Sequence, residues 1–298
     1  MRTLITGSFG FLGKHLQKLF NDDCLILPTR EDCDFRRQDM VEWYISKENP
    51  DVIINLAARV GGIGYNQQNP ATLFYDNAIM GINLIHAAYE NRIEKFVQVG
   101  TICAYPKITP IPFKEKDLWK GYPEDTNAPY GLAKKMLLVM AQAYRKQFGM
   151  NIIYLLPVNL YGEGDNFDPK SSHVIPAMIR KFIEAKDKVI LWGTGMPTRE
   201  FLYVADCAQA IYLATKNYNK PDPVNLGSGM EISIKDLAYK IRDIIGFKGE
   251  IIFDPTKPDG QPRRCLDISK AEKEFGFKAK TSFDEGLKKT ILWYQSRL

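Results

Sequence analysis

Apolar and polar positions alternate along the first half of the chain in a way that predicts strands followed by helices. Short apolar runs predict strands at residues 3–6, 24–27, 51–55, 95–99 and 152–156. Apolar positions repeat with the spacing of an amphipathic helix at residues 11–20, 41–47, 71–91 and 129–148. Nearly continuous apolar strands that alternate with helices are typical of a parallel sheet covered on both faces. We therefore expect an α/β fold with a Rossmann-type doubly wound parallel sheet.

The pattern changes near residue 162, where Gly, Asp and Pro cluster. Shorter elements follow, with helices predicted at residues 174–185, 205–215 and 234–245 and strands at residues 189–192 and 250–253. We expect a dinucleotide-binding domain over residues 1–162. A smaller C-terminal α/β substrate domain would cover residues 163–298, with some segments interleaved between the two.

Composition narrows the class of protein. The 298 residues are 45% hydrophobic and 25% charged, as in an ordinary globular enzyme. The net charge of +5, without a basic run, gives no reason to expect nucleic acid binding. No apolar stretch approaches the roughly 20 residues of a membrane span, and the first residues enter a strand pattern directly, so neither a membrane anchor nor a signal peptide is expected.

The five cysteines are widely spaced and lack metal-ligand or redox-motif spacing. We expect free thiols in a reducing cytoplasm and no metal site. They are Cys24, Cys33, Cys103, Cys207 and Cys265.

A glycine-rich turn follows the first predicted strand. Glycines spaced Gly-x-x-Gly-x-x-Gly let the backbone turn tightly and approach a pyrophosphate, although an ordinary strand-to-helix turn would also carry glycines. The position after the first strand favours a dinucleotide site. The residues expected to contact the cofactor are Gly7, Ser8, Phe9, Gly10, Phe11, Leu12 and Gly13.

The end of the second predicted strand indicates which dinucleotide binds. An NAD site usually has an acidic residue here to hold the ribose, whereas an arginine suits the 2′-phosphate of NADP. Arg30 comes first, which favours NADP(H). Glu31 and Asp32 follow directly, and either could bind a ribose if the loop turned differently.

The candidate chemistry lies between residues 100 and 134. Tyr130 and Lys134 are four residues apart in a predicted helix, so they share one face. A cation beside a phenol is expected to lower the pKa of the phenol and to make it a usable proton donor near neutral pH. Thr101 and Cys103 precede the pair. A Tyr/Lys/hydroxyl set handles a carbonyl or an alcohol, and the added thiol suggests more than a plain hydride transfer.

Several motifs are more specific than the glycine turn and the Tyr/Lys pair. They are Arg-Val-Gly-Gly-Ile at residues 59–63, Cys-Ala-Tyr-Pro-Lys at 103–107 and Ser-His-Val-Ile-Pro at 172–176. A further matching stretch is Lys-Pro-Asp-Gly-Gln-Pro-Arg at 257–263. Together with the other motifs, which span most of the chain, they resemble the extended short-chain dehydrogenase/reductase superfamily and, within it, the GDP-L-fucose synthase family.

The resemblance implies an NADPH-dependent enzyme that inverts C3 and C5 of GDP-4-keto-6-deoxy-mannose and then reduces C4. Tyr130 would protonate the C4 oxygen, Lys134 would hold the nicotinamide ribose, and Thr101 would orient the keto oxygen. Cys103 and His173 would be the acid/base pair for inversion.

The resemblance also implies binding residues and an assembly. Further cofactor contacts would come from Ala57, Pro157, Asn159, Leu160 and His173. The GDP-sugar would meet Asn159, Lys181, Trp192, Arg199, Lys257, Asp259 and Arg263. Two subunits would form a homodimer through the predicted helices at 71–91 and 129–148. Thr101 and Lys181 depart from the Ser and Arg that are usual in the family, which leaves the reaction class intact.

Other functions and simpler roles remain open at this point. A reductase acting only at C4 of a related GDP-keto-sugar, such as a heptose, needs the same Tyr130, Lys134 and Thr101. A non-catalytic NADP-binding regulator would not need the intact set, and a 4,6-dehydratase would need Asp-Glu where Ile102-Cys103 stand. A simple 4-epimerase needs no thiol. Taken alone, Cys103 would be a small core residue and His173 a helix cap.

Overall fold

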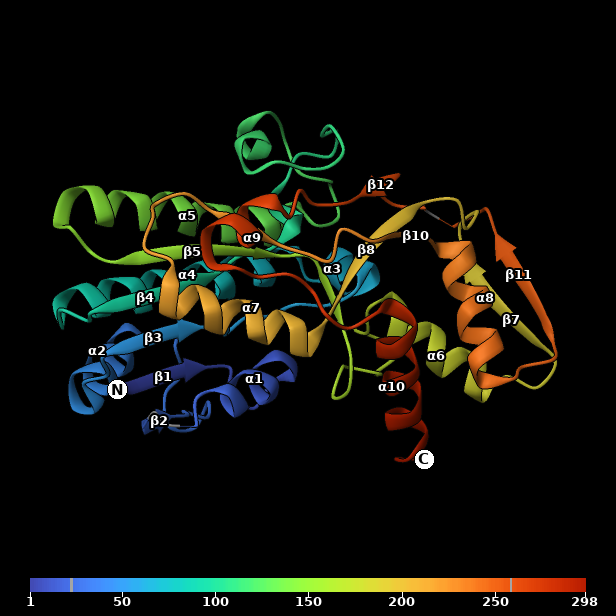
Figure 1. Cartoon of the computed structure of the whole chain (residues 1–298), viewed down its shortest axis with the longest axis horizontal. Coiled ribbons are helices and arrows are strands. Elements are labelled where there is room, and N and C mark those ends of the chain that lie inside the picture. Colours follow the sequence, from blue (N-terminus) through green and yellow to red (C-terminus); the bar gives the residue numbers. More distant parts are fainter. Residues whose placement is uncertain (22–23, 258) are drawn as a thin grey trace.

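The fold is given by a computed structural model that describes residues 1–21, 24–257 and 259–298 (Figure 1). Pro258, part of the motif at residues 257–263, lies outside the described residues. The largest sheet has six parallel strands in the order β2-β1-β3-β4-β5-β9. The strands are β1 (Arg2–Thr6), β2 (Cys24–Ile26), β3 (Val52–Asn55), β4 (Lys95–Val99), β5 (Ile152–Pro157) and β9 (Val224–Leu226). The predicted doubly wound parallel sheet is therefore confirmed.

The strand order reverses beside β1, because β2 lies on one side of it and β3 on the other. In open α/β sheets, ligands bind beyond the carboxyl ends of the strands at such a reversal. The turns that leave β1 and β3 are thus the first place to look for a cofactor site.

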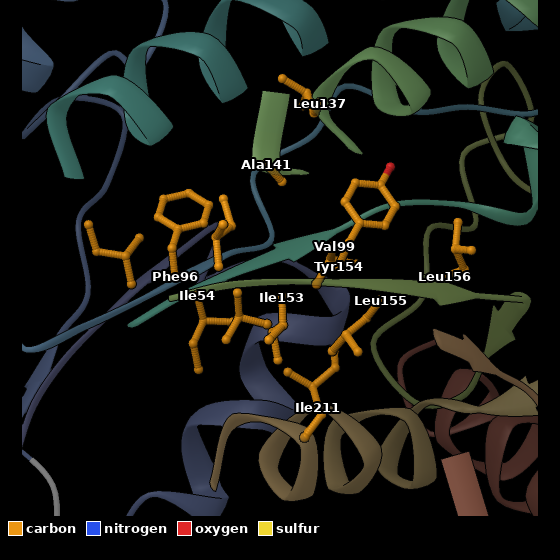
Figure 2. Close-up of a cluster of buried hydrophobic side chains, with 14 of the residues drawn as sticks. Ile54, Phe96, Val99, Leu137, Ala141, Ile153, Tyr154, Leu155, Leu156 and Ile211 are labelled. Carbon is orange, nitrogen blue, oxygen red and sulfur yellow. The ribbon is translucent and has the colours of Figure 1, made fainter. Parts of the chain in front are cut away.

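Helices cover both faces of this sheet. One face carries α2 (Gln38–Glu48), α4 (Pro70–Glu90) and α5 (Ala128–Phe148). The other carries α1 (Phe11–Leu16), the 3₁₀ turn η1 (Gln17–Leu19) and α7 (Val204–Asn217), with α9 (Ser269–Phe275) packed beside α7 and β9. Figure 2 shows Leu137 and Ala141 pointing from α5 towards one face and Ile211 from α7 towards the other. The strands inside the edge strand β2 are buried on both sides, which explains their continuous apolar sequences.

A second hydrophobic cluster lies beyond the ends of the large sheet. Its four-stranded sheet contains β6 (Asn159–Tyr161), β8 (Thr198–Tyr203), β10 (Glu231–Ser233) and β12 (Arg263–Arg264). A parallel pair, β7 (Lys188–Trp192) and β11 (Glu250–Asp254), lies nearby. Three helices complete the cluster: α6 (Val174–Glu184), α8 (Ile234–Ile245) and α10 (Phe283–Gln295).

Three short elements connect these parts: α3 (Ile63–Gln68), η2 (Ile102–Ala104) and η3 (Glu115–Trp119). No helix in the described residues is both long and apolar enough to cross a membrane.

Several predicted elements match the structure closely. The strand at 95–99 and the helix at 234–245 have the predicted bounds, and most other predicted elements differ by one to three residues at an end. The strands β6, β8, β9, β10 and β12 and the helices α3, α9 and α10 were not predicted. These strands are short, or mix charged and apolar residues, so their sequences lack a period that marks a strand.

Helix α5 is fixed to the sheet by Tyr154 of β5. The Tyr154 ring is buried, and its hydroxyl donates a 2.6 Å hydrogen bond to the backbone oxygen of Lys134. In Figure 2 the hydroxyl points from the strand towards α5. Gly100 makes room for the ring, since a Cβ there would lie 2.4 Å from it. The helix turn that carries Lys134 is therefore held directly by the sheet.

The same helix packs closely on the 3₁₀ turn η2. A Cβ added to Gly131 would lie 2.2 Å from the backbone oxygen of Cys103. The turn is closed by the Thr101 Oγ1, which accepts a 3.2 Å hydrogen bond from the Cys103 N–H. Glycine is thus required for α5 to lie against the turn that presents Cys103.

A buried carboxylate joins the second sheet to the segments around it. Glu200 of β8 is fully buried, and its two oxygens accept hydrogen bonds from three backbone N–H groups. The donors are Ser228 at 2.6 Å, Gly229 at 2.7 Å and Leu266 at 2.6 Å. The carboxylate thereby fixes the segment that follows β12 against β8.

Glu200→Gln should destabilise the fold, because the amide brings an NH₂ donor where a backbone N–H needs an acceptor. We expect the free energy of unfolding, measured by urea denaturation, to fall by about 1–3 kcal/mol. Glu250→Gln is the control, since Glu250 is exposed, and should change stability by less than about 0.5 kcal/mol. Equal denaturation midpoints for the two variants would contradict the role assigned to Glu200.

Gly131→Ala should separate α5 from η2, because two backbone segments must move to admit the new methyl group. We expect a loss of roughly 1–3 kcal/mol in the free energy of unfolding. Gly64→Ala is a matched control in a helix, because a Cβ there meets nothing within 4 Å. A Gly131→Ala variant as stable as Gly64→Ala would show that the contact is not tight.

Candidate functional site

The glycine turn after β1 is folded tightly enough to bring backbone close to a bound group. Gly7 has a φ of +65°, which favours glycine, and its oxygen accepts a 3.0 Å hydrogen bond from the Gly10 N–H. A Cβ on Gly13 would lie 2.3 Å from the Gly7 oxygen. The Ser8 Oγ is buried without a hydrogen-bond partner in the described residues. This open backbone cradle with an unused hydroxyl fits a dinucleotide pyrophosphate.

In the loop after β2, Asp32 and Arg30 differ in whether the side chain is free to contact a cofactor. The Asp32 carboxylate accepts hydrogen bonds from the Thr29 N–H at 2.8 Å and the Thr29 hydroxyl at 2.7 Å, and these bonds lower its pKa. Asp32 therefore closes the turn instead of reaching outward. The Arg30 side chain is 73% exposed and lies 3.6 Å from Asp34, so its guanidinium is accessible to an anion.

A chain of buried polar groups crosses the carboxyl ends of three strands. The Thr6 hydroxyl donates to Asn55 at 2.8 Å, the Asn55 amide to Gln98 at 3.0 Å, and the Gln98 amide to the Val99 oxygen at 2.9 Å. Lys134 Nζ donates to the same Val99 oxygen at 3.2 Å. Since all these side chains are buried, the chain links the end of β1 to the candidate catalytic lysine.

Tyr130, Lys134 and Thr101 come together at the end of β4 and the start of α5. The Tyr130 phenol is buried and hydrogen-bonds the Thr101 side chain. Burial lowers the pKa of Lys134 to about 8, and its Nζ points to the Val99 oxygen. The arrangement places a phenol, a hydroxyl and an ammonium group within one small region.

The prediction that Lys134 lowers the pKa of Tyr130 is wrong for this structure. Burial raises the pKa of Tyr130, the nearby Cys103 adds to the rise, and the hydrogen bond with Thr101 only partly opposes it. The physical reason is that removal from water destabilises the phenolate by more than the neighbouring groups stabilise it. Tyr130 is therefore a protonated phenol, which is the form that donates a proton.

Cys103 is half-buried, and the group that faces its sulfur was not among the predicted site residues. Nη1 of Arg264 lies 3.8 Å from the Cys103 Sγ. The adjacent Arg263, which was predicted to meet the GDP-sugar, pairs with Glu231 through Nε at 2.9 Å and Nη2 at 2.6 Å. Adjacent residues of a strand point to opposite faces, so only one of the two arginines can reach the thiol. A role for Arg263 towards the sugar nucleotide stays a prediction.

His173 stands immediately before α6. It occupies the N-cap position, but its side chain makes no capping hydrogen bond, so the simple capping role is not seen. The residue is exposed, yet enough protein surrounds its ring that loss of water lowers its pKa. The preceding segment contacts the 59–63 motif, because the Gly62 N–H donates a 3.0 Å hydrogen bond to the Ser171 oxygen. That His173 faces Cys103 across the substrate stays a prediction.

The remaining cofactor candidates line the ends of the strands. The Ala57 N–H donates to the Thr6 hydroxyl at 3.0 Å. Pro157 ends β5, and Asn159 and Leu160 begin β6 two residues later. The Asn159 amide donates to the backbone oxygen of Glu200 at 3.2 Å, which fixes its side chain beside β8.

The other sugar-nucleotide candidates surround the turn between β7 and β8. Lys181 Nζ donates to the Ile190 oxygen at 2.9 Å, and Trp192 is 54% exposed at the end of the same strand. The Asp259 carboxylate is used within the protein, because it accepts from the N–H and the hydroxyl of Thr194 at 2.7 and 2.9 Å. Lys257 is exposed.

Arg199 lies on the same side of the second sheet as Arg264. Its Nη2 donates to the backbone oxygen of Asp259 at 3.4 Å and its Nη1 to the backbone oxygen of Thr198 at 2.7 Å. Burial lowers its pKa to about 10, and the charge of Arg264 contributes to the shift. The candidate substrate region therefore holds positive charge next to an exposed indole.

Comparisons with known proteins agree with this geometry. The chain is 43% identical to the GDP-L-fucose synthase of Sinorhizobium fredii over 97% of this chain and 94% of that protein. Its structure is similar to a GDP-6-OMe-4-keto-L-xylo-heptose reductase from C. jejuni, with a TM-score of 0.93, 29% identity and coverage of 100% and 98% of the two chains. It is also similar to a GDP-L-fucose synthetase from Naegleria fowleri bound to NADP, with a TM-score of 0.91, 27% identity and coverage of 99% and 94%.

A family model supports the same relationship. The model of the NAD dependent epimerase/dehydratase family matches residues 3–227, which include the glycine turn, Thr101, Cys103, Tyr130 and Lys134. Because this match covers most of the chain, the protein belongs to the NAD dependent epimerase/dehydratase family.

Proposed function

We propose that this protein is an NADPH-dependent epimerase/reductase that converts GDP-4-keto-6-deoxy-D-mannose to GDP-L-fucose. The observation that carries the proposal is the site formed by Thr101, Tyr130 and Lys134 together with the accessible thiol of Cys103. The similarity to a GDP-L-fucose synthase over nearly the whole chain supports this substrate.

The cofactor would be held by the glycine turn, by Arg30 at the 2′-phosphate and by Lys134 at the nicotinamide ribose. The tight backbone at Gly7 and Gly13 and the exposed guanidinium of Arg30 support this assignment. When bound, NADPH supplies the hydride for C4 of the sugar.

Inversion at C3 and C5 depends on the ketone at C4, which acidifies the neighbouring C–H bonds. In the proposed reaction Cys103 removes a proton from one face and His173 returns one to the opposite face. A thiol and an imidazole suit this work because both ordinarily titrate within about two pH units of neutrality. Hydrogen bonds from Thr101 and Tyr130 to the C4 oxygen would stabilise the enolate.

Reduction at C4 requires a proton for the oxygen as the alkoxide forms. Tyr130 is suited to give it, because burial keeps the phenol protonated. Lys134 would supply positive charge nearby, and Thr101 would hold the oxygen in line with the phenol. One site can therefore serve both half-reactions.

A second candidate is a reductase that acts only at C4 of a related GDP-4-keto-sugar. The similarity to a GDP-heptose reductase favours it, since the two structures superpose over nearly their full lengths. The two functions differ in whether carbon-bound protons exchange with solvent.

We also propose a division of the chain and a location. Residues 1–162 would form the cofactor-binding domain and residues 163–298 the substrate domain, with β9 returning to the large sheet. The five cysteines are free thiols, which supports a reducing compartment such as the cytoplasm.

A homodimer through α4 and α5 is part of the proposal. Four of the apolar residues on these helices, Leu84, Ile85, Leu137 and Leu138, fill the core of the chain itself and do not argue for an interface. The large apolar residues that these helices leave exposed are Phe74 and Tyr75 on α4 and Val139 and Phe148 on α5. A hollow of about 270 Å³ lies between α2, α4 and α5, lined by Gln38, Ile82, Asn83, His86, Met140 and Tyr144. A second copy of this helix pair is the partner whose apolar side chains would fill it.

Light scattering at micromolar concentration should give a dimer of the 34.0 kDa chain. Met140→Glu should shift the population towards monomer, because it places a carboxylate in the proposed interface. Asn217→Glu, at an exposed position of α7 on the other side of the sheet, is the control, since it adds the same single negative charge. A monomeric wild type would refute the proposal.

Arg30→Ala should weaken NADPH much more than NADH, because only NADPH carries the 2′-phosphate. We expect the Michaelis constant for NADPH to rise by roughly 10-fold or more, because a hydrogen bond between charged groups contributes about 1.5–3 kcal/mol to binding. Glu31→Ala tests the alternative acidic ligand and should leave the ratio of the two constants nearly unchanged. Equal effects of Arg30→Ala on both cofactors would remove the basis for an NADP preference.

Tyr130→Phe should stop NADPH oxidation and still allow C3 or C5 hydrogens to exchange with deuterium from solvent. Cys103→Ser should slow that exchange greatly, because a serine hydroxyl is a far weaker base than a thiolate. His173→Gln should leave early exchange partly intact but prevent completion of the inversion. The readout is mass analysis of the sugar nucleotide after incubation in heavy water.

If the wild-type protein reduces the keto sugar without deuterium entering C3 or C5, the bifunctional proposal fails. That result would favour the C4-only reductase and make Cys103 and His173 structural residues.

A further inference from the structure

Arg264 is a buried cation aimed at the candidate catalytic thiol. It lies on β12, which pairs in parallel with β8 so that Arg264 is opposite Arg199 and Arg263 is opposite Thr198. Residues opposite each other on paired strands point to the same face. Arg264 and Arg199 therefore lie side by side, and Arg264 is only 8% exposed.

These two arginines differ from Arg263 in their ion pairing. In residues 1–21, 24–257 and 259–298, neither Arg199 nor Arg264 has a carboxylate within ion-pair distance, whereas the exposed Arg263 is paired with Glu231. Like charges opposite each other on neighbouring strands are destabilising, and the lowered pKa of Arg199 reflects this repulsion in addition to burial. An anion between or beside these guanidinium groups would relieve the cost.

The geometry of Arg264 is fixed by the motif that contains Cys103. Its Nε donates a 2.6 Å hydrogen bond to Gln261, and the Gln261 amide donates a 2.8 Å hydrogen bond to the Lys107 oxygen. Gln261 is 4% exposed. Residues 103–107 and 261–264 are thus joined at two points. One is the hydrogen bond between Gln261 and Lys107, and the other is the contact of Arg264 Nη1 with the Cys103 Sγ at 3.8 Å.

We propose that Arg264 is a positioning residue that holds the Cys103 sulfur and stabilises negative charge on it, so that the sulfur can act as the base in the epimerisation. The inference rests on the proposed function. In the step, the C–H bond next to the C4 ketone breaks, its proton forms the S–H bond of Cys103, and its electron pair moves into the enolate. His173 then gives a proton to the opposite face, and solvent restores both groups.

The other groups coupled to the thiol do not duplicate this role. Arg199 also interacts with the charge of Cys103, but its guanidinium donates to the backbone oxygens of Thr198 and Asp259 and makes no hydrogen bond to the sulfur among the described residues. Tyr130 is protonated and carries no charge. The carboxylate of Glu124 interacts with Arg264 but is already bonded to Thr126 and Asn127. Arg264 is therefore the cation best placed to stabilise a thiolate.

The direct test is the pH dependence of Cys103 alkylation by iodoacetamide in the substrate-free protein, followed by peptide mass spectrometry. Only the thiolate reacts, so the midpoint of the rate profile reports ionisation of this one thiol. We expect Arg264→Gln to raise the midpoint by about one pH unit or more, and Arg264→Lys to restore part of the shift. Arg263→Gln removes a charge from the same strand and should leave the midpoint unchanged.

A second readout uses deuterium incorporation at C3 and C5 from heavy water. The low-pH limb of the exchange rate should move to higher pH in Arg264→Gln, in parallel with alkylation. If Arg264→Gln does not fold, the comparison of Arg264→Lys with wild type carries the test, because a point charge without the Gln261 contact should still shift the midpoint upward.

The outcomes separate this inference from the proposed function. An unchanged alkylation midpoint in a folded Arg264→Gln variant overturns the inference, and a rise only in the Michaelis constant for the sugar nucleotide would then assign Arg264 to phosphate binding. A shifted midpoint in a protein whose wild type exchanges no deuterium would sustain the electrostatic pairing while the epimerase proposal fails.

Discussion

The site depends on one buried polar chain that crosses the carboxyl ends of β1, β3 and β4. The Ala57 N–H donates to the Thr6 hydroxyl, so that hydroxyl must donate onward to Asn55, and the amides of Asn55 and Gln98 continue in the same direction. The chain ends at the Val99 oxygen, which also accepts from Lys134. Only one orientation of each amide satisfies every partner, and an unsatisfied buried polar group costs about 1–3 kcal/mol.

This constraint explains how two distant parts of the sequence form one site. The glycine turn begins directly after Thr6, and Lys134 lies on the helix that carries Tyr130. Tyr154 holds the same turn of α5 from the sheet, and Gly131 lets the helix approach the turn that carries Cys103. Cofactor cradle, phenol and thiol are therefore positioned by rigid elements, as catalysis that depends on orientation requires. On the substrate side, Glu200 performs the corresponding task by holding the segment after β12.

Much of this organisation could be predicted from the sequence, and the limits have physical causes. The strand at 95–99 and the helix at 234–245 were predicted because periodicity and length agree with one structure. Tyr130, Lys134, Thr101 and Cys103 follow from spacing along one helix and one turn. β9 was missed because three residues give no period.

The parts of the site that could not be predicted from the sequence depend on tertiary contacts. Arg263 and Arg264 are identical residue types in sequence, and only the register of β12 on β8 decides which of them faces the thiol. The pKa of Tyr130 was predicted in the wrong direction because the sequence shows a neighbouring lysine but not the extent of burial. In the structure, burial outweighs the hydrogen bond from Thr101.

The central claim is that one site both inverts and reduces the sugar. The most direct measurement is nuclear magnetic resonance of the product formed from GDP-4-keto-6-deoxy-D-mannose and NADPH, with the ring configuration assigned from proton couplings at C3, C4 and C5. The account predicts the L-galacto configuration of GDP-L-fucose. A 6-deoxy sugar that keeps the D configuration, reduced only at C4, would contradict it.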